Sequence, residues 1–159
     1  MPITLDDLTV NFEHLDRATV LSDWQWLLGN RKLPILLSAI GDAFVQDVDD
    51  GTVHLLSSGE GTLQQVAANL AEFQALLNSH DFVDENFVPE FIVELRGSAL
   101  LLGPGKLYGY KIPPCLDGSY SIDNLEPTDI EVHFSRLGQL HQQTRGLEPG
   151  TRVTGTEIK

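Results

Sequence analysis

The sequence predicts an α+β fold: a single domain in which helices pack on a mainly antiparallel sheet. Three observations support this prediction. The chain has 159 residues and 42% hydrophobic residues, which suits one domain with an ordinary core. An Asp-Asp-Gly turn at residues 49–51 separates two short apolar segments, as in a β-hairpin. Other segments carry apolar residues at helical spacing.

The first expected helix covers residues 16–29. Its apolar side chains recur at the spacing of one helical face: Val20, Leu21, Trp24, Leu27 and Leu28. Asp16 suits the N-cap position, and Gly29 suits the end of the helix. We expect Trp24 to anchor the core, whereas Trp26 lies off this face.

Strands are expected next. Residues 35–37 form a short apolar run typical of a buried strand, and residues 43–48 and 52–56 flank the 49–51 turn. Phe44 should face the opposite side of the sheet from Ala43 and Val45, because side chains alternate along a strand. Residues 43–56 are therefore predicted to form a β-hairpin.

The most regular helical pattern covers residues 62–77, where Thr62 and Gln65 could form a capping box. Residues 80–97 predict a helix with a break near 86–88, since Pro89 suits a first helical turn, and an end at Gly97. The alternation in residues 130–134 indicates another strand, and residues 137–146 are expected to begin a short last helix.

The segment of residues 108–125, YGYKIPPCLDGSYSIDNL, contains all three tyrosines and has neither period. A long loop in a compact domain is usually functional or packed by its own side chains. We interpret it as an ordered structural loop, with a partner-binding loop as the alternative. The predicted divisions are an acidic N-terminal lead (1–15), the α+β domain (16–146) and a C-terminal tail (147–159).

The negative charge is unevenly distributed. Residues 1–95 contain 3 basic and 16 acidic side chains, a balance of −13, whereas residues 96–159 contain 7 of each. Direct binding to nucleic acid is disfavoured, because phosphate contacts need clustered Lys and Arg. An acidic field suits either solubility or the capture of a basic partner. The N-terminus lacks the features of a signal peptide and no apolar run is long enough to span a bilayer, so a cytoplasmic protein without membrane contact is expected.

No pattern of catalytic or metal-binding residues stands out. The five histidines lack metal-ligand spacing, and nothing in the sequence supports pairing the lone Cys115 with His133 or His141 beyond coincidence. Gly59 and Gly61 are too few for a phosphate cradle, where Glu60 would repel an anion. Asp47, Asp49 and Asp50 lack the further ligands of a calcium loop. We therefore predict a protein that is not an enzyme and has no cofactor or metal.

The order of several short motifs resembles a bacterial family. The first half reads WQWLLG, IGDAF, DGTVHLL, GEG and EFQALL; the second reads LGPGKLYGYKIPPCLDGSYSIDN and VHFSRLGQLHQQ. Together they are similar to the C-terminal domain of immunity proteins that accompany type VI secretion DNase toxins, over residues 20–145. Asp117 stands where the family pattern commonly has Gly, and the short lead is too small for the GAD-like domain that precedes many relatives.

The resemblance implies an immunity protein that binds and neutralises a cognate toxin, one expected to be a DNase with a basic surface. An acidic inhibitor can compete with DNA phosphates for such a surface. Charge location places the predicted contact on seven carboxylates: Asp47, Asp49, Asp50, Glu60, Asp81, Asp84 and Glu85. The alternatives are a general protein- or ligand-binding module and an enzyme that uses Cys115 with a histidine.

Overall fold

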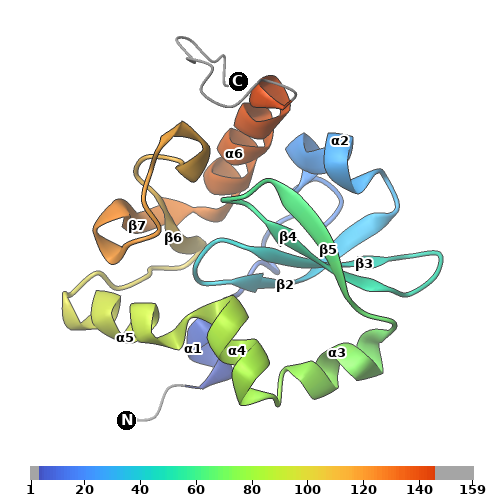
Figure 1. Cartoon of the computed structure of the whole chain (residues 1–159), viewed down its shortest axis with the longest axis horizontal. Coiled ribbons are helices and arrows are strands. Elements are labelled where there is room, and N and C mark those ends of the chain that lie inside the picture. The colour runs from blue at the N-terminus through green and yellow to red at the C-terminus, as the bar shows by residue number, and fades with distance from the viewer. Residues whose placement is uncertain (1–3, 146–159) are drawn as a thin grey trace.

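The computed structural model describes residues 4–145 and contains two antiparallel sheets with helices on both sides (Figure 1). The larger sheet has the order β1-β2-β3-β4-β5, a meander in which each strand pairs with the next along the chain. Its strands are β1 (Thr9–Val10), β2 (Lys32–Ser38), β3 (Ala43–Asp47), β4 (Val53–Ser57) and β5 (Thr62–Ala67). The smaller sheet pairs β6 (Lys106–Tyr110) with β7 (Leu125–Asp129). The predicted α+β class is confirmed.

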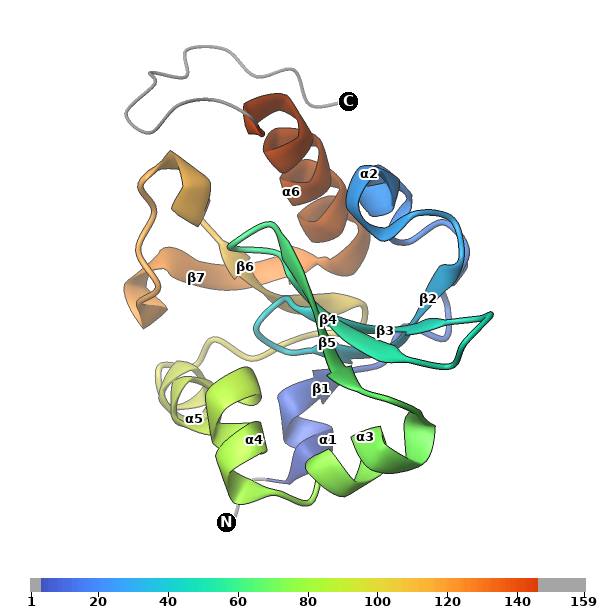
Figure 2. The ribbon, with the colours of Figure 1, turned by 45° about the vertical axis from the view of Figure 1, so that its right-hand side comes forward.

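The helices form two layers, one on each face of the larger sheet (Figures 1 and 2). One layer holds the 3₁₀ turn η1 (Ser22–Trp24), α2 (Gln25–Leu28) and α6 (Ile130–Thr144). The other holds α1 (Leu5–Leu8), α3 (Leu70–Leu76), α4 (His80–Phe87) and α5 (Pro89–Gly97). Each layer has its own apolar core. Strand β3 serves both, because Ala43 and Val45 lie in the first core and Phe44 in the second, as the alternation predicted.

Two predicted features are present as expected. Strands β3 and β4 pair in an antiparallel hairpin within residues 43–56. The helical region 80–97 breaks at Val88, which has a left-handed backbone (φ 45°), and α5 begins at Pro89. Phe87, Ile92 and Leu95 are buried on the sheet side of these helices.

The helix predicted for residues 62–77 is wrong in its first half. Thr62–Ala67 is edge strand β5, and the helix begins only at Leu70, where the Asn69 side chain accepts the Glu72 N–H (2.8 Å). Ala67 pairs with Val53 but Gln65 with His54, so Val66 is an extra residue in the ladder. This bulge interrupts the strand alternation, and the apolar spacing then imitates a helix.

The strand predicted for residues 130–134 is also wrong: these residues form the first turns of α6, directly after β7. The buried side chains follow the spacing of a helix rather than a strand: Ile130, Phe134 and Leu137 lie in the core. Val132, which completed the apparent alternation, is 53% exposed. The predicted last helix therefore exists but begins at Ile130.

The helix predicted for residues 16–29 is much shorter. Asp16 caps only a turn, by accepting the Ala18 N–H, and regular helix is limited to η1 and the four residues of α2. Gly29 (φ 72°) ends it as expected. Trp24 is fully buried, and its indole Nε1–H donates to the Phe134 carbonyl of α6 (2.9 Å). This region is shaped by its attachment to α6 rather than by helix propensity.

The tyrosine-rich segment is a strand followed by a packed loop. Tyr108 and Tyr110 belong to β6, which the missing period did not predict. Loop 111–124, with the short turns η2 (Pro114–Leu116) and η3 (Ile122–Asn124), is tied together by Asn124. Its amide bonds both backbone groups of Ile112 and the Ser119 carbonyl. Residues 111–124 are thus packed by their own side chains, whereas residues 108–110 and 125, predicted as part of the loop, lie in β6 and β7.

Of the two predicted terminal segments, only the acidic lead falls within the described residues, from residue 4 onwards. Within the acidic lead, α1 precedes β1, and β1 pairs with β2 at the edge of the larger sheet. The predicted tail (147–159) lies outside the described residues. The domain boundaries at residues 16 and 146 remain a prediction. Within residues 4–145, no helix is both long and apolar enough to span a membrane.

Candidate partner-binding surface

The seven predicted carboxylates lie at three places in the fold. Asp47, Asp49 and Asp50 are at the β3–β4 turn, and Glu60 is at the β4–β5 turn, at the opposite end of β4. Asp81, Asp84 and Glu85 lie on α4. The structure therefore does not bring all seven together, and the three groups differ in their surroundings.

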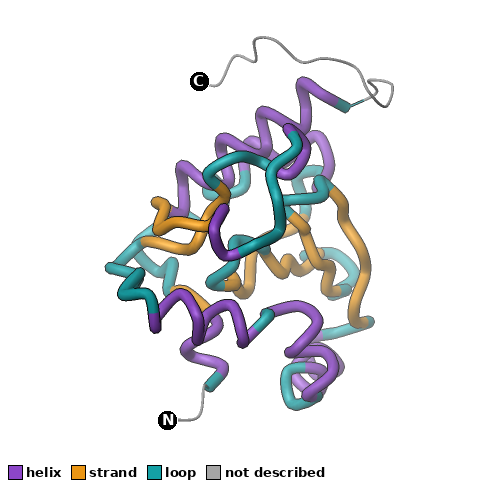
Figure 3. The backbone as a smooth tube through the Cα atoms, turned by 60° about the vertical axis from the view of Figure 1, so that its left-hand side comes forward, coloured by secondary structure: helices purple, strands orange, loops and turns teal. Residues whose placement is uncertain are grey.

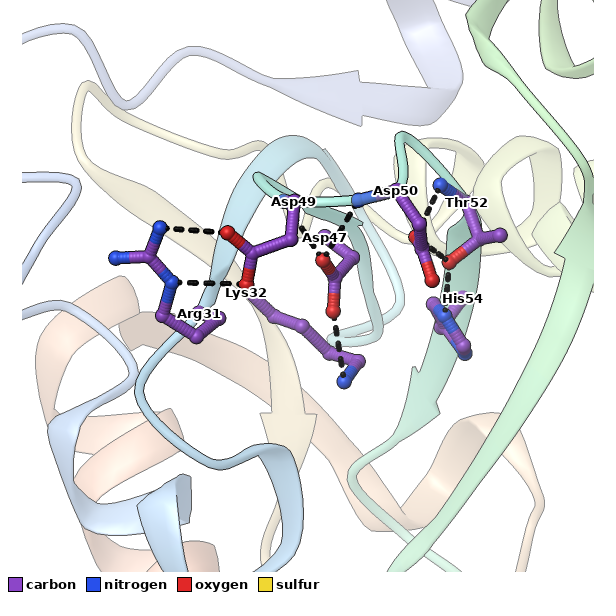
Figure 4. A network of polar contacts seen from close by, with 7 residues as sticks. All are labelled: Arg31, Lys32, Asp47, Asp49, Asp50, Thr52 and His54. Carbon is purple, nitrogen blue, oxygen red and sulfur yellow. Dashed lines mark hydrogen bonds and ion pairs between the residues drawn. The ribbon is translucent and has the colours of Figure 1, made fainter.

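The β3–β4 turn is partly neutralised by cations of the same chain (Figure 4). Arg31 forms a two-pronged ion pair with Asp49, with N–O distances of 2.7 and 3.0 Å. The Lys32 ammonium lies 3.4 Å from Asp47, whose pKa is held low mainly by the backbone N–H groups of Asp49 and Asp50. Two of the three carboxylates thus have cationic partners within the chain, which weakens this turn as a site for a basic partner.

The same turn ends in a chain of hydrogen bonds. The Asp50 carboxylate accepts from both the side chain and the backbone of Thr52, and these bonds lower its pKa. The Thr52 hydroxyl in turn lies 2.8 Å from His54 Nε2 (Figure 4). No group of three or more metal-ligating side chains that could hold a metal ion occurs among residues 4–145. The three aspartates therefore stabilise the turn through hydrogen bonds and ion pairs.

Glu60 and Glu85 share a pocket of about 500 Å³, which we call the tyrosine pocket. It lies between the β4–β5 turn, loop 111–124 and helices α4 and α5, elements on the side brought forward in Figure 3. Its lining combines apolar, carboxylate and phenol groups: Ile40, Asp42, Leu55, Ser57, Glu60, Glu85, Asn86, Val88, Phe91, Tyr110, Tyr120 and Leu125.

Asp42 is the acidic lining residue that the sequence prediction missed. It follows Gly41 at the β2–β3 turn, and its Oδ1 accepts the Ser58 N–H (3.0 Å). Desolvation raises the pKa of the Asp42 carboxyl to about 6, against the lowering effect of the Ser58 hydrogen bonds. In the sequence, only the position of Asp42 inside the IGDAF motif distinguishes it, because a count of charges treats Asp42 like every other acidic residue.

Two tyrosines from the tyrosine-rich segment form one wall of the pocket. The rings of Tyr110 and Tyr120 meet edge to face at 5.9 Å, and the Tyr120 hydroxyl donates to Glu60 Oε1 (2.9 Å). Desolvation raises the pKa of both phenols, and the Glu60 carboxylate raises that of Tyr120 further. Both hydroxyls therefore stay protonated at neutral pH and can act as donors and acceptors.

Ser58 and His133 lie together with the pocket residue Asp42, but not in the arrangement of a catalytic triad. The imidazole Nε2 of His133 lies 2.8 Å from the Gly41 carbonyl, to which it must donate, so it cannot accept the Ser58 proton. Burial lowers the pKa of His133 to about 4. Ser58 is itself fully buried. This cluster fastens α6 to the sheet.

The other residues considered for chemistry also have structural surroundings. His141 Nε2 bonds the Ser58 carbonyl (2.9 Å), and a Cβ on Gly61 would come within 2.5 Å of its ring. Gly59 and Gly61 belong to the β4–β5 turn, close to Tyr110 and His141. Desolvation raises the pKa of the Cys115 thiol, which is opposite to the activation of a nucleophile.

Comparisons with known proteins bear on the fold and on the family. No curated protein matches the chain significantly. The crystal structure of Atu4351 from Agrobacterium tumefaciens is similar, with a TM-score of 0.57 and 14% identity, over 89% of this chain and 73% of that one. At that identity the likeness concerns the fold alone.

A family model described as "T6SS immunity protein Tdi1, C-terminal" matches residues 67–141. The match runs from the end of β5 to the last turn of α6 and includes Glu85, Tyr110 and Tyr120 of the tyrosine pocket. The resemblance predicted from the sequence motifs is thereby confirmed. Residues 67–141 are therefore similar to the C-terminal domain of the type VI secretion immunity protein Tdi1 family.

Proposed function

We propose that this protein neutralises a cognate type VI secretion toxin by direct contact through its acidic half, without catalysis. The observation that carries the proposal is the family match over residues 67–141. The charge supports a physical route, because the first 95 residues carry the whole excess of −13. A nuclease toxin must hold DNA phosphates with basic side chains, and carboxylates can compete for the same side chains.

The candidate contacts differ in how far cations of the same chain already neutralise them. Within residues 4–145, no ion pair involves Glu60, Asp81, Asp84 or Glu85, and all four are exposed. Asp47 and Asp49 already face Lys32 and Arg31. A basic partner gains more from carboxylates that have no cation of their own. We therefore place the main contact on α4 and the β4–β5 turn.

The decisive test uses a type VI secretion effector encoded next to the gene of this protein as the candidate toxin. The two proteins are co-expressed, and survival of the host, recovery of a complex and inhibition of DNA cleavage by the purified effector are measured. Rescue with a stable complex supports the proposal. Rescue without any complex, or a complex that leaves cleavage unchanged, contradicts neutralisation by direct contact.

Charge reversal then tests the surface. Replacing Asp81 and Asp84 by Lys should weaken the complex and make its affinity less sensitive to salt. Replacing Asp49 and Asp50 by Lys should have the smaller effect, since one of that pair is already neutralised by Arg31. Unchanged affinity for both double reversals would contradict a mechanism that depends on these carboxylates.

A further inference from the structure

We propose that the tyrosine pocket binds an arginine side chain of the cognate toxin. The pocket then provides specificity in a contact that otherwise depends on exposed carboxylates of α4 and the β4–β5 turn. The proposal rests on the proposed function, because it names the chemistry of one subsite of that contact. It assigns a role to Tyr110, Tyr120 and Asp42, which charge counting alone did not select.

The first argument is charge complementarity. Three carboxylates from three elements line the pocket: Asp42 after β2, Glu60 after β4 and Glu85 on α4. None of them belongs to an ion pair within residues 4–145, and no Lys or Arg lines the pocket. Asp42 and Glu60 are close enough for mutual repulsion. A cation that enters the pocket relieves this repulsion.

The second argument is the free acceptor capacity of these groups. Both hydrogen bonds to Asp42 reach Oδ1, so no bond among the described residues uses Oδ2. The Tyr120 hydroxyl occupies only Oε1 of Glu60. A carboxylate offers about four lone-pair sites, so several acceptors remain for a donor that enters. The low-dielectric surroundings of Asp42 disfavour its charged form, and a cation bound beside the carboxylate offsets this cost.

The third argument favours arginine over lysine. The carboxylates stand beside apolar and aromatic surface from Leu55, Phe91, Tyr110 and Tyr120. A guanidinium group is planar and weakly hydrated, stacks on aromatic faces, and presents five donors to several acceptors at once. A strongly hydrated ammonium group loses more hydration in such a site. The mixed lining therefore fits an arginine side chain best.

A small-molecule probe tests the pocket without the toxin. N-acetyl-L-arginine amide is titrated into the full chain, and backbone amide shifts are followed by heteronuclear NMR. Saturable shifts should concentrate at Asp42, Ser57–Gly61 and Tyr120. N-acetyl-L-norleucine amide, which has a similar apolar stem but no charge, should produce much smaller shifts. Equal shifts with both compounds, or shifts spread over the whole acidic surface, would overturn the proposal.

Matched variants separate the pocket from net charge. Glu60→Gln with Glu85→Gln removes two pocket charges while keeping side-chain shape, and should abolish saturation by the arginine probe. Glu90→Gln with Glu94→Gln removes two exposed charges on α5 that do not line the pocket, and should leave it unchanged. Circular dichroism confirms that both proteins are folded. Equal losses in the two variants would overturn the assignment, and so would tighter binding of N-acetyl-L-lysine amide than of the arginine compound.

The effector complex separates failure of this inference from failure of the proposed function. If the wild-type protein binds and inhibits the effector, the Glu60→Gln/Glu85→Gln variant should bind at least about tenfold more weakly at 150 mM salt. Wild-type binding with full affinity of that variant overturns the pocket but leaves the proposed function standing. No binding by the wild-type protein overturns the proposed function, while the arginine titration still reports on the pocket.

Discussion

At the scale of single residues, Gly138 shows how closely α6 approaches the region of η1. A Cβ at this position would lie 2.6 Å from the Asp23 carbonyl oxygen, which is backbone and cannot move aside alone. The Gly138 carbonyl also accepts the Trp26 indole N–H (3.1 Å), and Ser135 donates to the Asp23 carboxylate (2.6 Å). The glycine of the GQLHQQ motif is therefore explained by this contact.

Gly138→Ala should destabilise the protein by about 2 kcal/mol, because overpacking against backbone outweighs the gain in helix propensity. The measurement is the free energy of unfolding in urea at pH 7. Gly97→Ala is the control: it also lies in a helix, but a Cβ there meets nothing within 4 Å. That variant should be as stable as the wild type or slightly more stable. Equal stabilities for Gly138→Ala and the wild type would contradict the described contact.

Asp42 should give the stability a distinctive pH dependence. Its folded-state pKa of about 6 exceeds the ordinary value of 3.8, so the folded protein binds the proton more tightly. Asp42 therefore disfavours folding above pH 6, and this cost disappears as the pH falls towards 4. His133, whose pKa is lowered to about 4 from 6.5, acts in the opposite direction over the same range.

Asp42→Asn should accordingly stabilise the protein at pH 7 by roughly 1–2 kcal/mol, provided that the amide oxygen keeps the Ser58 hydrogen bond. The advantage over the wild type should shrink between pH 6 and pH 4, because the wild-type carboxyl becomes neutral. Urea unfolding of both proteins at pH 7.0, 5.5 and 4.5 measures the difference. An advantage that does not change with pH would contradict the raised pKa.

At the scale of elements, the boundary between β5 and α3 makes a sharp prediction. The structure places the helix cap at Asn69, whereas the sequence pattern placed it at Thr62. Asn69→Ala should reduce stability by about 1 kcal/mol, the usual cost of losing an N-cap. Thr62→Ala, on an exposed edge strand, should cost less than half of that. Thermal and urea unfolding of both variants decide the question, and the reverse order would favour the helix at 62–77.

The elements that could be predicted from the sequence are those whose signals are local. The 43–56 hairpin follows from its turn residues, and the break at Val88 follows from Pro89. Thr62–Ala67 could not be predicted in this way, because the bulge at Val66 and pairing with β4 override an apparently helical spacing. The strand expected at residues 130–134 failed because Val132, its middle apolar residue, faces solvent. Tertiary context decided both cases.

At the scale of the whole molecule, the sequence gives the sign and the chain location of the charge but not its grouping in space. Asp47, Asp49, Glu60 and Glu85 appear equivalent in a count of charges. In the fold, Asp47 pairs with Lys32 and Asp49 pairs with Arg31. Glu60 and Glu85 instead line one pocket together with Asp42. Ion pairs and pockets form between residues distant in the chain, so a composition argument cannot detect them.

This grouping predicts how association with a basic effector depends on salt. Raising NaCl from about 50 to 500 mM should slow association roughly tenfold or more, with a smaller change in dissociation, because steering acts before contact. The Asp81→Lys/Asp84→Lys variant should associate more slowly than the wild type at low salt and show a flatter salt dependence. Stopped-flow or surface-plasmon measurements provide both rates.

The control for this prediction carries the same change in net charge elsewhere. Glu126 and Glu131 are exposed and belong to the half of the chain whose charges balance. Replacing both by Lys should preserve most of the wild-type salt dependence, since the field near α4 is little altered. If the two variants slow association equally, net charge alone governs the encounter and its location on α4 has no special role. If only the α4 variant does so, Asp81 and Asp84 on α4 steer the toxin during the encounter.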